Sequence, residues 1–343
     1  MVVLASAWFQ YDYNDQLDVV WETLALGGDI IIVTVNHRLG VLGFIDSTSN
    51  GTSAAAGIED VFLSLAWIRE HIESFEGDPK SLVGFGFGSG SYLTSIDLFA
   101  EKLGKKSVFK RLVLHGLSPT SLLPRTERSS LAMIATSMQC KETAGAFSHI
   151  DCLKDASLKS ISETTSKFPW LLFTPGCDRP PFGGCDNVFA KLTSTLTGIS
   201  ILCGHNTYDG DVLFQYILSM MPRQSVIPDN PEILFNYAQK FFTGNRTAQK
   251  VPPELQQYLE QGRGSNVDKF KQLLSDMVLR CPMMELAHET SAKGAVVHVY
   301  NSYGDHKLLD PAVMMADIIA FVKTGHKTIF LLINARAFRA CIE

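Results

Sequence analysis

Residues 82–91 read LVGFGFGSGS, a short apolar run that leads into alternating glycines and two serines. Such a run, followed by a helical pattern, predicts a strand, a tight turn and a helix. Two chemistries use this turn. A dinucleotide site needs G-x-G-x-x-G, but the frames that start at Gly84 and Gly86 end in Ser89 and Ser91, and no P-loop lysine follows. The other is the nucleophile elbow, G-x-S-x-G, in which glycines let the backbone turn sharply and raise a serine above the sheet.

The elbow frame is complete except at its centre. Gly86 and Gly90 occupy the outer positions of G-x-S-x-G, and Gly88 stands where the nucleophile belongs. Ser89 comes one place later and has no glycine two residues before or after it. The residues therefore predict a turn of elbow shape that lacks its nucleophile.

Apolar runs of strand length alternate with helical patterns along the chain. In residues 57–75, apolar side chains recur at intervals of three and four, and the GDP at 77–79 ends the run. Residues 91–103 repeat the pattern as far as Gly104, a typical helix C-cap. The alternation predicts an α/β protein with a mostly parallel central sheet flanked by helices, and a helical, loop-rich insertion at about residues 120–195. The apolar runs suit strands covered on both faces and are residues 2–8, 29–35, 81–87, 111–115, 198–203 and 295–300.

Composition excludes several classes of protein. A hydrophobic content of 46% over 343 residues fits a folded globular chain and excludes a disordered or collagen-like one. The net charge of −5 and the lack of a basic stripe argue against a nucleic-acid partner. No apolar run approaches the roughly 20 residues of a membrane span, and the opening MVVLASAWFQ lacks the basic start of a signal peptide. Without a cysteine or histidine cluster of zinc spacing or a cofactor motif, we expect neither metal nor cofactor.

Segments on both sides of the elbow resemble motifs of the type-B carboxylesterase/cholinesterase family. Residues 34–44, TVNHRLGVLGF, are similar to V-N-Y-R-L-G-x-x-G-F, and residues 57–79 contain GIED, LAWI and FEGDP, similar to G-L-x-D, L-x-W-V and F-G-G-D-P. Residues 275–282, SDMVLRCP, resemble D-x-x-F-x-C-P, and residues 321–325, FVKTG, resemble F-x-x-T-G. These matches occur in the family's order from residue 1 to about residue 327. The resemblance implies the α/β-hydrolase fold.

The same resemblance assigns the positions of the catalytic triad. In the family's F-G-E-S-A-G the serine attacks an ester carbonyl; here Phe87 replaces the glutamate, Gly88 the nucleophile and Ser89 the alanine. The acid of K-D-E-G falls on Asp209, although a solvated loop acid is the simpler interpretation of that residue. The histidine is expected after the last strand, where His306 stands outside the usual H-G-x-E/D motif, and a surface or loop histidine is the simpler interpretation of that residue.

The oxyanion segment, H/Y-G-G-G-F in the family, falls on residues 5–9, ASAWF. The resemblance assigns the oxyanion-binding backbone N–H groups to Ala7, Trp8 and Ser89, and the side chains of Ala7 and especially Trp8 should obstruct the approach. Loss of a triad nucleophile lowers turnover by about 10⁶. Loss of one oxyanion donor lowers it by a further factor of about 10²–10³. We therefore expect little ester hydrolysis.

The expected function is that of a non-catalytic cholinesterase-like protein. It would bind an extracellular protein partner or a small apolar ligand through the surface of the hydrolase fold. The alternative is an active carboxylic ester hydrolase in which Ser89 serves as a relocated nucleophile with Asp209 and His306.

Cysteines and glycosylation motifs bear on the compartment. Cys140 and Cys152 resemble the family's short C…CL disulfide loop, which is typical of an oxidising compartment. Asn50 in NGT and Asn245 in NRT begin N-glycosylation sequons. Together these features imply an extracellular or cell-surface location. The pairing of the other cysteines stays open; they are Cys177, Cys185, Cys203, Cys281 and Cys341.

The motifs also suggest how much of the family's domain the chain contains. Met1 stands inside what resembles a central strand, and residues 329–343 match none of the motifs. We expect one carboxylesterase type-B domain over residues 1–343, without the family's first strands and its C-terminal end.

Overall fold

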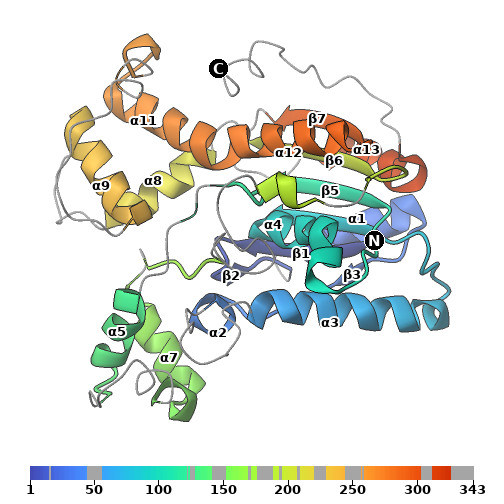
Figure 1. Cartoon of the computed structure of the whole chain (residues 1–343), viewed down its shortest axis with the longest axis horizontal. Coiled ribbons are helices and arrows are strands. Elements are labelled where there is room, and N and C mark those ends of the chain that lie inside the picture. Colours follow the sequence, from blue (N-terminus) through green and yellow to red (C-terminus); the bar gives the residue numbers. More distant parts are fainter. Residues whose placement is uncertain are drawn as a thin grey trace.

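A computed structural model describes the protein over most of its length. The described residues are 1–14, 17–44, 56–121, 123, 128–140, 152–168, 171–175, 188–192, 195–206, 209–219, 229–243, 256, 259–302 and 311–325. They contain a seven-stranded sheet in the order β2-β1-β4-β5-β6-β7, with β3 paired to β1 (Figure 1). Every described pairing is parallel except that of β1 with β2. The strands are β1 (Val2–Ala7), β2 (Tyr11–Asp12), β3 (Val33–Thr34), β4 (Val83–Gly88), β5 (Arg111–Gly116), β6 (Ser200–Asn206) and β7 (Val296–Ser302).

The six strands expected from the sequence are all present, but the second is much shorter than predicted. Residues 29–35 yield only the two-residue strand β3, which is held to β1 by Val33 N–H to the Met1 carbonyl and Val35 N–H to the Val3 carbonyl. Among the described strands β3 pairs only with β1. Ile31 is exposed. The prediction of burial on both faces was therefore wrong at this end of the run, because no second neighbour covers it within the described residues.

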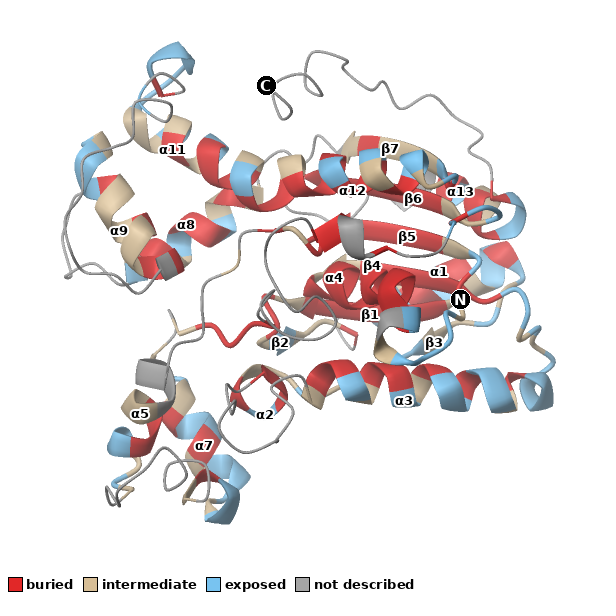
Figure 2. Ribbon diagram, in the orientation of Figure 1, coloured by how far each residue is buried: buried red, intermediate tan, exposed pale blue. Residues whose placement is uncertain are grey.

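Two hydrophobic cores lie on opposite faces of the sheet. Alternate strand residues such as Val3 and Phe85 pack with α1 (Asp18–Gly28) and α13 (Pro311–Thr324). Their neighbours along the strands, such as Leu4, belong to the larger core, which includes residues of α3, α4 and α12. This division follows from the period of two in a strand, which sends successive side chains to opposite faces. Figure 2 shows the resulting buried strands between helices.

The two helices predicted from spacing are confirmed, and each ends in a segment of 3₁₀ helix. α3 (Ala56–His71) continues as a 3₁₀ turn over Ile72–Phe75, and in Figure 2 its buried and exposed residues alternate along the helix. α4 (Ser89–Ser95) continues as 3₁₀ helix over Ile96–Leu103. Gly104 ends this segment in the left-handed conformation, with φ +65°, as expected of a C-cap.

Of the remaining described helices, α12 packs on β6 and β7, whereas α8, α9 and α11 pack on one another. In the predicted insertion, α5 and α7 lie together at a distance from the sheet (Figure 1). Within the described residues, no helix is both long and apolar enough to cross a membrane. These helices are α2 (Gly40–Phe44), α5 (Arg128–Ser137), α7 (Leu158–Thr165), α8 (Asp209–Ser219), α9 (Pro231–Thr243), α11 (Asn266–Ser275) and α12 (Cys281–Ala292), with a 3₁₀ turn at Val188–Lys191 and a π-helix at Asp276–Arg280.

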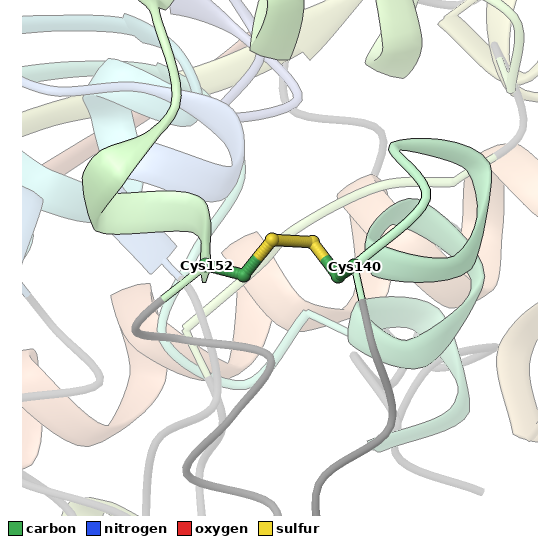
Figure 3. The surroundings of a disulfide bond; sticks show 2 residues. All are labelled: Cys140 and Cys152. Atoms are coloured by element: carbon green, nitrogen blue, oxygen red, sulfur yellow. A yellow bond between two sulfur atoms is a disulfide. The ribbon is translucent and has the colours of Figure 1, made fainter.

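The predicted disulfide between Cys140 and Cys152 is present (Figure 3). It joins two cysteines twelve residues apart, with Cα atoms separated by 6.0 Å, and connects the segments that carry α5 and α7. Cys281 is also disulfide-bonded. Cys203 is a buried free thiol, and burial raises its pKa to about 12. Cys177, Cys185 and Cys341 lie outside the described residues.

Gly90 allows α4 to pack directly on β1, so Gly90→Ala is expected to destabilise the fold. A Cβ at Gly90 would overlap the carbonyl oxygen of Leu4. We expect the free energy of unfolding, measured by urea denaturation, to fall by about 1–3 kcal/mol. The matched control is Gly27→Ala in α1, where a Cβ would stand 3.7 Å from Ile319. That change should be neutral or stabilising by up to about 1 kcal/mol. Equal effects of the two substitutions would contradict this prediction.

Candidate functional site

The turn between β4 and α4 has the strained shape of a nucleophile elbow. Gly88 caps α4 with φ 61° and ψ −122°, a conformation that side chains disfavour and glycine adopts at no steric cost. Gly86 is required by close packing, since a Cβ there would lie 2.5 Å from Ser91 Cα. The frame read in residues 82–91 therefore folds as predicted, with glycine at its centre.

The backbone of β1 occupies the space in which a nucleophile would begin. A Cβ at Gly88 would overlap the carbonyl oxygen of Ser6, the residue that pairs with Gly88 across the sheet. On the other side, the backbone of Gly88 lies so near Gly116 that a Cβ on Gly116 would come within 2.9 Å of Gly88 Cα. The elbow is therefore confined by both neighbouring strands, and the local geometry accommodates no side chain at Gly88.

Ser89, the candidate relocated nucleophile, is fully buried and its hydroxyl is already engaged. Ser89 Oγ lies 2.9 Å from Ser6 Oγ and accepts a hydrogen bond of 2.8 Å from the backbone N–H of Phe9. Both partners belong to the segment that resembles the oxyanion loop. The hydroxyl thus links the start of α4 to the end of β1.

That segment, residues 5–9, keeps a tight turn although it lacks the family's glycines. Trp8 and Phe9 have φ values of 50° and 61°, each expected to cost about 1–3 kcal/mol in a non-glycine residue. Aromatic packing holds them in place. The Phe9 ring meets Phe44 and Tyr92 edge-on at 5.0 and 5.4 Å, and the Trp8 ring meets Tyr216 at 6.2 Å. Ala7 accepts the hydrogen bond that closes the turn.

Asp209, at the position of the triad acid, lies where β6 passes into α8. Its Oδ2 accepts the backbone N–H of Asn206 at 3.1 Å, and its Oδ1 accepts the Asn206 side-chain amide at 3.2 Å. As the first residue of α8, the carboxylate also benefits from the positive end of the helix dipole. Asp209 and Gly88 line one cavity, so the structure brings these two predicted positions together. His306 lies outside the described residues.

Sequence analysis missed a second histidine in this region, His115. It pairs with Phe87 across the sheet at the end of β5, and its ring stacks between Phe87 at 5.3 Å and Tyr300 at 5.7 Å. His115 Nδ1 lies 2.6 Å from the Tyr300 hydroxyl. Burial lowers the pKa of His115, although the charge of Asp209 opposes the shift, so the imidazole is neutral. A polar residue inside the apolar run RLVLHG was the signal that could have identified it.

A cavity of about 380 Å³ opens at the C-terminal ends of β1, β4, β5 and β6. Its walls include the aromatic side chains of Trp8, Tyr13 and Phe87, and its polar groups include His115 and Asp209. Parallel α/β sheets bind ligands at this edge. Over the described part of the chain, no group of His, Cys, Asp and Glu side chains is arranged to hold a metal ion. The arrangement suits binding of an organic molecule.

Comparison with known proteins identifies the family. The sequence profile described as "Carboxylesterase family" matches residues 1–331. The chain belongs to the carboxylesterase family. The resemblance found in the motifs is thereby confirmed.

Individual carboxylesterase-family relatives are distant and longer than this chain. Acetylcholinesterase-1 of Trittame loki is 24% identical over 305 residues, which cover 81% of this chain and 53% of that protein. Thyroglobulin of Bos taurus is 29% identical over 148 residues, or 42% of this chain and 5% of thyroglobulin. A Geobacillus stearothermophilus carboxylesterase structure superposes with a TM-score of 0.74 at 18% identity, covering 97% of this chain and 74% of that one. The chain has the α/β-hydrolase fold and spans about half or less of these curated relatives.

Ser89 and Ser91 offer a matched test of the hydroxyl link between α4 and β1. Ser89→Ala leaves the buried N–H of Phe9 without its acceptor, so we expect a loss of about 1–3 kcal/mol in the free energy of unfolding. Ser91 is equally buried, but its hydroxyl has no hydrogen-bond partner in the described structure. Ser91→Ala should therefore be neutral or slightly stabilising in the same urea titration. A reversed order of the two effects would contradict the assignment.

Buried His205, beside this cavity's histidine, should make the protein sensitive to acid. Burial is the main cause that lowers the pKa of His205 from its ordinary value of 6.5 to about 3, and repulsion by His115, when that ring is protonated at low pH, and by Arg280 adds to the shift. Between these two pH values the unfolded chain binds a proton that the folded protein does not, so stability falls as pH drops from about 6.5 towards 3. In His205→Gln the urea midpoint should fall less steeply over this range. Comparison at pH 8 measures the packing effect of the substitution separately, and an unchanged slope would refute the prediction.

Proposed function

We propose that this carboxylesterase-family protein is a non-catalytic, cholinesterase-like binding protein. The observation that carries the proposal is the elbow itself: Gly88 supplies no nucleophile, and the Ser6 carbonyl lies where a side chain at that position would start. The turn at Trp8 further supports it, because Trp8 and Phe9 carry large side chains at positive φ where the family's oxyanion segment has glycines.

The proposed partner is an extracellular protein or a small apolar ligand, and the proposed location is extracellular or on the cell surface. The Cys140–Cys152 disulfide supports an oxidising compartment. The sequons at Asn50 and Asn245 lie outside the described residues. A single carboxylesterase type-B domain over residues 1–343 stays part of this proposal.

The alternative function is ester hydrolysis by Ser89 with Asp209 and His306. In its favour, Ser89 and Asp209 both line the cavity. Against it, Ser89 is fully buried and its Oγ already accepts a hydrogen bond from the backbone N–H of Phe9, which occupies one lone pair of that oxygen. A serine nucleophile also needs a base within hydrogen-bond reach, and no described base contacts the Ser89 hydroxyl.

The decisive experiment is labelling with a fluorophosphonate probe, which reacts with activated serines, after circular dichroism has confirmed folding. We expect no labelling of the wild-type protein and no hydrolysis of short-chain aryl esters. Gly88→Ser should stay unlabelled as well, because its Cβ would displace the Ser6 carbonyl. Wild-type labelling that is lost in Ser89→Ala would overturn the proposal and establish the hydrolase alternative.

A further inference from the structure

We propose that a groove beside α3 binds a small anionic amphiphile, with its carboxylate at Arg69 and its apolar tail along the helix. This α3 groove lies between the helix and residues 105–108 and has a volume of about 370 Å³. Among the described residues, it shares no lining side chain with the cavity at the elbow. The site therefore goes beyond the proposed function and does not depend on it.

The floor of the α3 groove is apolar. Phe62, Leu65 and Ala66 line it from α3, and Val108 lines it from the segment before β5. Phe62 and Leu65 are buried and belong to the larger hydrophobic core, whereas Ala66 is exposed. Covering this floor with an apolar chain is favourable, because it removes apolar surface from water.

The rim of the α3 groove is positively charged. Its described lining residues include three basic side chains and one acidic side chain, although the whole chain has a net charge of −5. They are Arg69, Lys105, Lys106 and Glu70, and all four residues are exposed. The rim therefore favours an anion over a cation, and a headgroup from solvent can reach it in the folded protein.

The basic side chains of the rim differ in what they contact. Lys105 Nζ lies 3.2 Å from Glu59 Oε2 and 5.9 Å from the centre of the Phe62 ring, so its charge is already engaged. Arg69 and Lys106 form no hydrogen bond or ion pair in the part of the chain that the structure describes. A guanidinium can hold a carboxylate through two parallel hydrogen bonds. The headgroup therefore belongs at Arg69, and Lys106 adds to the attraction.

The length of the apolar floor sets the length of the tail. Arg69 follows Phe62 by two turns of α3, which is about 10 Å along the helix axis. A tail that starts at Arg69 would extend over Ala66 towards Phe62, where the ammonium of Lys105 ends the apolar surface. With C–C bonds of about 1.5 Å, an extended chain of about eight carbons covers this distance. A medium-chain fatty acid carboxylate therefore matches the groove in charge and in length.

The test measures octanoate binding at low ionic strength by calorimetry or ligand-observed NMR. We expect Arg69→Gln to weaken octanoate binding by about 2–5-fold, the contribution of one exposed ion pair. Glu70→Gln should strengthen it, because the change removes the carboxylate that repels the headgroup. The two residues are neighbours in α3, so opposite effects separate the role of charge from damage to the helix. Binding of 1-octanol, which has the same chain and no charge, should respond to neither change.

Two further variants locate the binding in the α3 groove. Arg263→Gln changes an exposed arginine that does not line the groove, and it should leave octanoate affinity unchanged. Ala66→Glu places a carboxylate on the exposed part of the floor and should reduce octanoate binding below detection. Circular dichroism and the urea midpoint establish that each variant is folded.

The α3 site would be refuted by absence of octanoate binding to the wild-type protein, by equal affinity of Arg69→Gln, by weaker binding in Glu70→Gln, or by binding that survives Ala66→Glu. Attachment of the protein to phosphatidylglycerol vesicles without octanoate binding would refute it in favour of a membrane surface. Fluorophosphonate labelling of the wild-type protein, in contrast, would overturn the proposed non-catalytic function and leave the octanoate measurements intact. The two proposals can therefore fail separately.

Discussion

The close approach of the β1 backbone to the elbow is the constraint on which the rest of the structure depends. The carbonyl of Leu4 occupies the space of a side chain at Gly90, and the carbonyl of Ser6 occupies that of a side chain at Gly88. This packing joins α4 to the sheet and sets the end of β4 beside β1. The packing of β1 against the elbow that stabilises the fold thus also leaves no space for a nucleophilic side chain at Gly88.

Around this contact, most polar groups of the site are paired with one another. The hydroxyl of Ser89 binds the end of β1, and Asp209 binds Asn206 at the start of α8. A serine hydrolase instead needs a hydroxyl, a base and N–H donors that are free to meet a substrate. Ser89 and Asp209 are thus engaged within the protein, whereas the buried Nε2 of His115 and hydroxyl of Ser91 have no hydrogen-bond partner in the described structure.

The difference between contacts that are local in the sequence and contacts between distant residues explains which predictions were confirmed. Spacing within a short stretch of sequence predicts the strands, the helices at 57–75 and 91–103, the cap at Gly104 and the elbow. Each of these depends on residues that are close to one another in the chain. The prediction for residues 29–35 was wrong at Ile31, because whether an apolar strand is covered depends on neighbours elsewhere in the sheet. The Arg38–Asp60 ion pair, at 2.7 Å, joins the segment of residues 34–44 to α3 and could not be derived from either residue alone.

The sequence by itself determined the α/β-hydrolase fold and an elbow that has glycine in place of serine, since the apolar period, the turn glycines and the ordered motifs are local properties of the chain. Only the tertiary structure decided that the Ser6 carbonyl fills the space at Gly88 and that the hydroxyl of Ser6 meets that of Ser89, 83 residues later in the chain. It also decided that His115 meets Tyr300, 185 residues later. The physical reason is that such contacts arise from strand order and close packing of the backbone. These bring together residues that are far apart in the sequence, and the sequence around each residue does not indicate the contact.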